Sequence, residues 1–159
     1  MKKILMLACC TICIVLIYSC HKDSKVVPAD YYFKAGKNGT DWGAQGSTYT
    51  IPGDSLKLTA LNQAGGEQMY IDIKFNGNGT YPLTGKQAAF SITTGTDVIT
   101  SNYRLDTTQT SSLVISSYNT KTRIISGTFM LHVLLDSSDP NVYVPINFGN
   151  GVFRVKLPD

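Results

Sequence analysis

The feature that most constrains the fold of this chain is a set of short runs in which apolar and polar residues alternate. Four such runs cover residues 56–61, 69–75, 129–135 and 152–157. Successive side chains of a β-strand point to opposite faces, so this period of two predicts strands that bury one face each. The runs are rich in Val, Ile, Thr, Tyr and Phe, which are the residues that strands favour.

Turn-forming sequences separate these runs at hairpin spacing. The clearest are Asn38-Gly39, Pro52-Gly53-Asp54, Gly65-Gly66, the run 76–79 and Gly149-Asn150-Gly151. Asn-Gly tolerates the positive φ angles that tight hairpins need. No window has a helical period, and strands without crossover helices pair antiparallel with their sequence neighbours. We therefore predict an all-β fold, a single antiparallel meander of about nine strands that forms a sandwich or a barrel-like domain. The run 124–135 is apolar on both faces over its later half and predicts a central strand.

The N-terminal residues predict export. Met1-Lys2-Lys3 gives a positive start, and an apolar run of about 14 residues follows, which is shorter than the ~20 residues of a membrane-spanning helix. Ile17, Ser19 and Cys20 resemble the lipobox of bacterial lipoproteins, from which Tyr18 departs because a small residue is usual there. The resemblance implies a signal peptide over 1–19, cleavage before Cys20, and lipid on the Cys20 thiol.

This leader divides the chain into three parts: the signal peptide 1–19, a polar tether 20–29, and an all-β domain 30–159. The other cysteines, Cys9, Cys10 and Cys13, fall within the leader, so the mature domain has no thiol beyond Cys20. Loss of Lys2 and Lys3 lowers the formal charge from +3 to +1. No basic run remains, and we expect no nucleic-acid partner. The expected partners are the membrane, through the lipid on Cys20, and an unidentified envelope protein or glycan.

The predicted domain is poor in the residues that catalyse reactions or bind metals. Its one histidine, His132, lies among apolar residues, and we expect it to have no catalytic role, because a general base needs a positioned partner. One histidine without thiols does not make a zinc site. The run 136–141 is rich in oxygen ligands but lacks the calcium-loop pattern, so we interpret it as a hairpin loop. Asp72 is expected to face solvent near Lys74, and Glu67 is the single glutamate. We predict no catalytic residue, metal or cofactor.

Two speculative sites remain. Tyr32 and Trp42 are candidates for binding a ligand, although aromatic residues also fill β cores. Asp54-Ser55-Leu56 and Asp106-Thr107-Thr108 resemble a short O-glycosylation motif of Bacteroidetes, which makes Ser55 and Thr107 hypothetical modification sites.

Several segments together resemble a family of small Bacteroidetes lipoproteins with no assigned function. They are Phe33-Lys34-Ala35, Asn38-Gly39, Trp42-Gly43-Ala44, the run 79–83 and the run 125–129. The resemblance implies an all-β exported domain after a lipobox, and it brings no catalytic residues.

The sequence is compatible with three functions. The first is a non-enzymatic protein with a binding or structural role, anchored by lipid to the bacterial outer membrane on its periplasmic or cell-surface face. The second is a module that binds a carbohydrate or hydrophobic ligand, which a pocket lined by Trp42, Tyr32 or Met130 would favour. The third is a hydrolase that uses dispersed Ser and Asp residues with His132, which a buried His132 bonded to both residue types would favour.

Overall fold

A computed structural model describes residues 31–51, 55–62, 64, 66–94, 98–139 and 142–157, and for 47–51 it describes the backbone alone. The described chain forms ten strands. They are β1 (Tyr32–Lys37), β2 (Thr40–Ile51), β3 (Ser55–Asn62), β4 (Glu67–Lys74), β5 (Gly79–Leu83), β6 (Ala88–Thr94), β7 (Val98–Leu105), β8 (Ser111–Asn119), β9 (Ile124–Leu135) and β10 (Pro145–Lys156).

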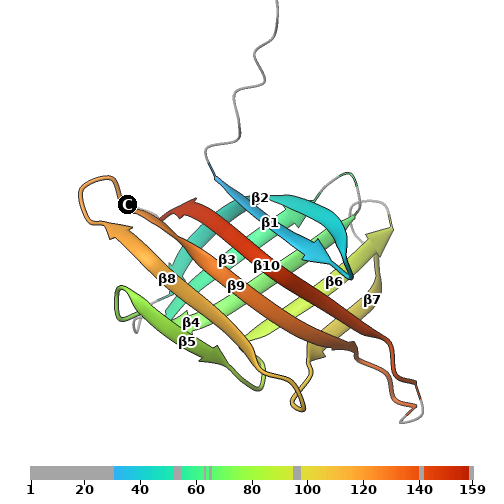
Figure 1. Ribbon diagram of the computed structural model, residues 1–159. Coiled ribbons are helices and arrows are strands. Elements are labelled where there is room, and N and C mark those ends of the chain that lie inside the picture. Colours follow the sequence, from blue (N-terminus) through green and yellow to red (C-terminus); the bar gives the residue numbers. More distant parts are fainter. Residues whose placement is uncertain are drawn as a thin grey trace, which may run out of the picture.

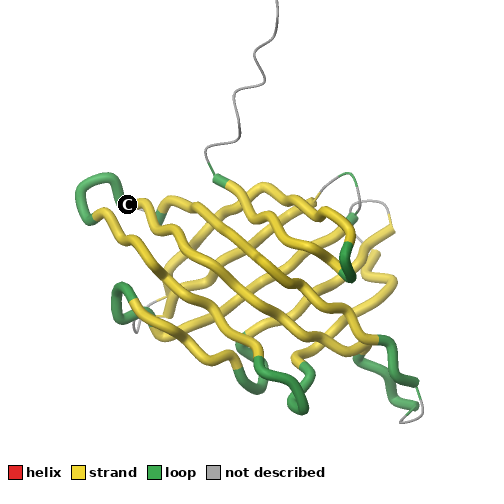
Figure 2. Tube along the Cα trace, viewed as in Figure 1, coloured by secondary structure: helices red, strands yellow, loops and turns green. Residues whose placement is uncertain are grey.

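These strands close into an antiparallel barrel (Figure 1). The order β10-β1-β2-β3-β4-β6-β7-β9 returns to its start because β10 pairs with both β1 and β9. Eight strands form the barrel, and β5 and β8 are two extra strands beside it. The all-β prediction is confirmed, with a barrel rather than a sandwich. Within the described residues no segment is helical (Figure 2), and none has the length and apolarity that a membrane-spanning helix requires.

The two extra strands interrupt the predicted meander in a regular way. On β9, Leu105 of β7 stands opposite Val133, and Ser112 of β8 stands opposite Met130. Strands β7 and β8 therefore follow one another along β9, with residues 106–110 looped out between them. In the same manner β6 pairs with β7 while β5 pairs with β8. The eight barrel strands thus keep the order of a meander, and β5 and β8 add a second antiparallel pair beside β9.

The barrel interior is packed with apolar side chains, as the alternating runs predict. Phe33, Phe90, Phe148 and Phe153 are among the largest fully buried side chains. A series of ring contacts runs through the interior from Trp42 to Phe148, Phe90 and Tyr103, with centroids 5.1 to 5.8 Å apart. Aromatic pairs at such distances add to the stability that burial provides.

The turn predictions have different outcomes. Asn38 and Gly39 have φ angles of 48° and 82° and join Lys37 to its partner Thr40, which confirms the tight hairpin. The turn predicted at Gly149-Asn150-Gly151 is wrong. These residues lie inside β10, where the register against β9 shifts between Phe148 and Gly151. An inserted residue that bends a strand uses the same positive φ that a turn needs, and Asn150 has a φ of 51°.

The two ends of the barrel are called rims below. The near rim is the end of the barrel at which β1 begins. It also carries the turn 120–123 between β8 and β9 and the end of β10. The far rim carries the turn Asn38-Gly39, Gly66 at the start of β4, and the end of β6.

Candidate functional site

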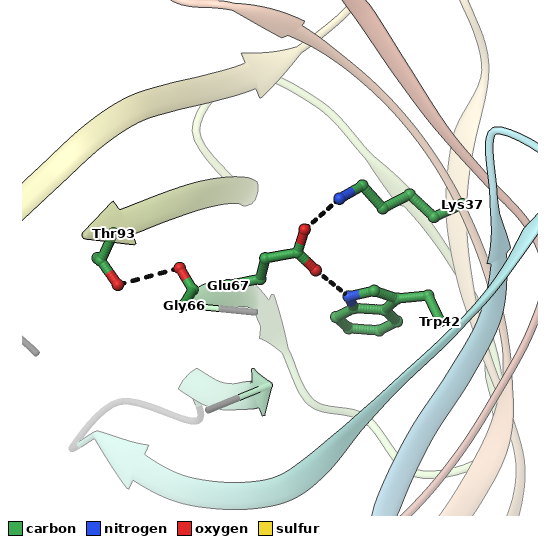
Figure 3. A network of polar contacts seen from close by, with 5 residues as sticks. All are labelled: Lys37, Trp42, Gly66, Glu67 and Thr93. Carbon is green, nitrogen blue, oxygen red and sulfur yellow. Dashed lines mark hydrogen bonds and ion pairs between the residues drawn. The ribbon is translucent and has the colours of Figure 1, made fainter. Parts of the chain in front are cut away.

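The best-defined polar cluster of the barrel lies at the far rim (Figure 3). Lys37 ends β1, Trp42 lies near the start of β2, and Glu67 begins β4. Trp42 Nε1 donates a hydrogen bond of 2.6 Å to Glu67 Oε2, and Lys37 Nζ forms an ion pair with Glu67 Oε1. Lys37 Nζ also lies 5.1 Å from the centroid of the Phe90 ring. Both carboxylate oxygens of Glu67 are therefore bound within the protein.

The surroundings of this cluster indicate a structural role. Next to Glu67, the Gly66 carbonyl accepts hydrogen bonds from Thr93 N at 2.6 Å and Thr93 Oγ1 at 3.0 Å. These contacts hold β4 against β6, while Glu67 holds β4 against the β1–β2 hairpin across the rim. The side chains of Lys37 and Glu67 are 23% and 13% exposed, so the ion pair is partly screened by solvent. The polar groups of this cluster at the far rim therefore already have partners within the protein.

This cluster was not predicted from the sequence. Lys37 was not among the candidate residues, and Glu67 was noted only as the single glutamate. The alternation of β4 did indicate where Glu67 points. Glu67 lies on the same strand face as Met69, Ile71 and Ile73, all of which face the interior. A charged residue in the inward phase at a strand end needs a partner inside the barrel mouth.

The structure separates Tyr32 and Trp42. Trp42 stands opposite Ala35, is 6% exposed and packs on Phe148 inside the barrel. Tyr32 stands opposite Gln45 on the outer wall, where Lys34 Nζ lies 5.0 Å from its ring centroid. The two aromatic side chains therefore do not form one platform.

Open grooves on the outer wall border the candidate aromatic residues and Met130. The first, of about 660 Å³, runs over β1, β2 and β10, and its lining includes Lys34, Asp41, Asn150 and the edge of Trp42. The second, of about 540 Å³, borders Tyr32, and the third, of about 450 Å³, borders Met130. Gly36 and Gly43 line the first groove, and a Cβ at either residue would make only ordinary contacts at 3.7 and 3.9 Å. Close packing does not require these two glycines, and they leave the strand backbone bare.

His132 lies near a serine and an aspartate, but not in the arrangement of a catalytic triad. Its backbone N donates to Ser111 Oγ at 2.9 Å, and its imidazole Nδ1 lies 2.7 Å from Asn147 Oδ1. Asp106 N donates to the His132 carbonyl at 2.9 Å. Ser111 thus contacts the main chain of His132 while the ring faces Asn147, and a triad needs the serine hydroxyl on the ring.

The loop between β7 and β8 explains why Asp106 and Ser111 are buried. His132 lies opposite the gap between the end of β7 at Leu105 and the start of β8 at Ser111. Its carbonyl accepts a hydrogen bond from Asp106 N, and its backbone N donates to Ser111 Oγ, so both backbone groups are satisfied. Asp106 Oδ1 accepts hydrogen bonds from Thr108 Oγ1 at 2.6 Å and Thr108 N at 2.9 Å, which shapes the loop. These bonds lower the pKa of Asp106 below its usual 3.8, against the opposing effect of burial, and His132 and Arg104 lower it further.

This lowered pKa makes the stability of the barrel depend on acid. The unfolded chain binds a proton more readily at Asp106 than the folded chain does, so the contribution is present above about pH 4 and is lost as the pH falls through the folded pKa. We expect Asp106→Asn to lower the free energy of unfolding by about 1–3 kcal/mol near neutral pH. The deficit should shrink at an acid pH below the lowered pKa of Asp106.

Urea unfolding at the two pH values measures this effect. Asp136→Asn is the control, because the side chain of Asp136 is 52% exposed and its ion pair with Arg104 contributes little. Equal losses for Asp106→Asn at both pH values would contradict this role of the Asp106 carboxylate.

The other candidate residues are placed as follows. Asp136 pairs with Arg104 at 3.3 Å, and Ser137 Oγ accepts from Asp139 N, as in a hairpin loop. No three His, Cys, Asp or Glu residues group into a metal site among the residues that the structure describes. Asp72 is half-buried on the outer wall, where its carboxylate lies 3.7 Å from Lys57 Nζ and accepts a hydrogen bond of 2.5 Å from Ser55 Oγ. Thr107 is exposed, and Cys20 lies outside the described residues.

Comparison with known proteins gives a family without a function. A family described as a domain of unknown function, DUF6252, matches residues 29–158. No curated protein and no solved structure matches the chain.

Proposed function

Because this chain belongs to the DUF6252 family of domains of unknown function, we propose a role from its own residues: a lipid-anchored protein of the bacterial outer membrane that displays a rigid barrel with a binding or structural task. Its parts are the signal peptide 1–19, the lipid-bearing Cys20, the tether 20–29 and the barrel domain. We also propose that the chain is one of the small Bacteroidetes lipoproteins that it resembles.

The observation that carries the anchoring is the sequence Ile17-Tyr18-Ser19-Cys20 after a charged start and a short apolar run. Export with lipidation accounts for the apolar run, for its shortness and for the position of the cysteine. Two or more acyl chains give stable anchoring, since each buried CH₂ contributes roughly 0.8 kcal/mol. The outer membrane is the proposed location, on its periplasmic or its external face.

The packing of the barrel supports a non-enzymatic role. The aromatic side chains from Trp42 to Tyr103 occupy the interior. The polar groups around Glu67, and those around the backbone of His132, form hydrogen bonds within the protein. A catalytic group must be able to reach a substrate, whereas Glu67 and Asp106 are already bound by neighbours. The folded domain is therefore suited to present a surface.

A second candidate function is binding of a carbohydrate on the outer wall. The observation that favours it is the groove over β1, β2 and β10, where Lys34, Asp41 and Asn150 surround bare glycine backbone beside the Trp42 edge. Sugar hydroxyls can form hydrogen bonds with such polar groups. Screening of the mature chain against a glycan array tests this candidate, and the absence of any retained glycan contradicts it.

Metabolic labelling tests the anchoring. Cells that express the full chain are grown with an alkyne-tagged fatty acid, and the purified protein is examined for the tag. We expect the label on the protein, and on the N-terminal peptide that begins at Cys20 after digestion. A protein that carries no label while a known lipoprotein in the same cells does would contradict the proposal.

A further inference from the structure

The charged residues of the barrel are unevenly distributed between its rims. Most described acidic residues lie toward the far rim: Asp41, Glu67, Asp136 and Asp139. The turn between β8 and β9 at the near rim carries Lys121 and Arg123, and the end of β10 carries Arg154. We call Lys121, Arg123 and Arg154 the basic face.

The register shows that the basic face adjoins the start of β1. Arg154 stands opposite Tyr32, the first residue of β1, and on its other side opposite Ser126 of β9. Arg123 lies three residues before Ser126, and its carbonyl accepts a hydrogen bond of 2.7 Å from Leu157 N. Neighbouring strands are about 4.8 Å apart. The turn 120–123 is therefore two strands away from the start of β1, at the same rim (Figure 1).

The cations of the basic face are weakly compensated by the described residues around them. Arg154 Nε is buried and has no hydrogen-bond partner among the described residues. The described ion pairs join Lys37, Lys57 and Arg104 to acids elsewhere, and none involves a residue of the basic face. Asp30, Asp54 and Asp159 lie outside the described residues.

We propose that the basic face docks on the anionic headgroups of the bilayer into which Cys20 is anchored. The proposal rests on the proposed lipid anchor, which brings the chain to the membrane at the end where β1 begins. Basic residues next to a lipid anchor add an electrostatic attraction to anionic lipids that acts within about a Debye length of the surface. Docking of the near rim turns the far rim, with its acidic residues, away from the membrane.

Vesicle binding of the unacylated mature chain, residues 20–159 with Cys20→Ser, tests the docking without the acyl chains. Co-sedimentation compares purely phosphatidylcholine vesicles with vesicles that also contain about 30% phosphatidylglycerol, at low and at physiological salt. We expect binding to the anionic vesicles that weakens with salt, and little binding to the zwitterionic ones. Equal binding to both vesicle types would overturn the proposal.

Two charge-matched double variants locate the surface. Lys121→Gln with Arg123→Asn removes two cations of the basic face, and Asn suits the φ of 57° at position 123. Lys86→Gln with Arg104→Gln removes two exposed cations elsewhere. Each basic residue near an anionic surface strengthens binding by about fivefold, so the first variant should bind about 10- to 30-fold more weakly. The second should change by less than about threefold, since its cations lie away from the surface. Equal losses would assign the binding to net charge and overturn the proposal.

A soluble polyanion separates lipid docking from general anion binding. If double-stranded DNA bound the mature chain as tightly as the anionic vesicles do, the basic face would not be a membrane-docking surface. Failure of the proposed lipid anchor can be distinguished from failure of the proposed docking. The vesicle assays use a chain without acyl groups, and the labelling of Cys20 is measured separately.

Discussion

Gly127→Ala is expected to lower the free energy of unfolding by at least about 4–5 kcal/mol, or to prevent folding. A Cβ at this position would lie 1.8 Å from the carbonyl oxygen of Val114 and 2.9 Å from its carbonyl carbon. Both contacts are with the backbone of the paired strand β8, so no side chain can rotate to relieve them. The strands would have to separate where β9 stands opposite Ile115.

Gly149→Ala is the matched control for this substitution. Gly149 also lies in a long strand beside a shift in register, yet a Cβ there meets nothing within 4 Å. Loss of glycine entropy in the unfolded chain should make this control neutral, or stabilising by about 0.4–1 kcal/mol. Urea unfolding of both variants measures the difference, and hydrogen exchange should show the amides of β8 losing protection in Gly127→Ala. A difference of less than about 1 kcal/mol between the variants would contradict the close approach of β8 to β9.

Cys20→Ala is expected to abolish the lipid anchoring of the cleaved protein. Without the thiol no diacylglycerol is attached, and an apolar run of about 14 residues is too short to span the bilayer. In cells fractionated after lysis, we expect the normal protein in the membrane pellet and most of the Cys20→Ala protein in the soluble fraction or retained as uncleaved precursor. The alkyne-tagged fatty acid should be absent from the variant.

Cys13→Ala is the control, because Cys13 lies in the segment predicted to be removed. It should leave both the location and the labelling of the protein unchanged. If Cys20→Ala stayed in the membrane as fully as the normal protein, with its leader cleaved, another feature of the chain would have to hold it there.

The strands and the core followed from local pattern, because alternation determines which residues can be buried. Phe129, Leu131 and Val133 were expected on one face of a central strand, and they are buried in β9, between β10 on one side and β7 and β8 on the other. Closure of the barrel was not predictable, because it depends on the pairing of β10 with β1, which are more than 100 residues apart. The number of strands differed because a looped-out segment such as 106–110 carries the same turn residues as a hairpin.

The polar clusters were less predictable than the core. Glu67, Lys37 and Trp42 are distant in sequence, and only the barrel brings them to one rim. Asp106 and Ser111 have a role only because β7 and β8 follow one strand with a gap between them. The sequence also could not show that Tyr32 and Trp42 lie on opposite faces of the wall, because that placement depends on the register of β1 against β2.

The intact mass of the protein extracted from its membrane tests the central claim, a barrel held to the envelope by lipid on its N-terminal cysteine. We predict a chain that has lost residues 1–19 and has gained the mass of acyl chains, all of it on the peptide that begins at Cys20. A chain that retains Met1 to Ser19, or that begins at Cys20 with an unmodified thiol, would contradict the account.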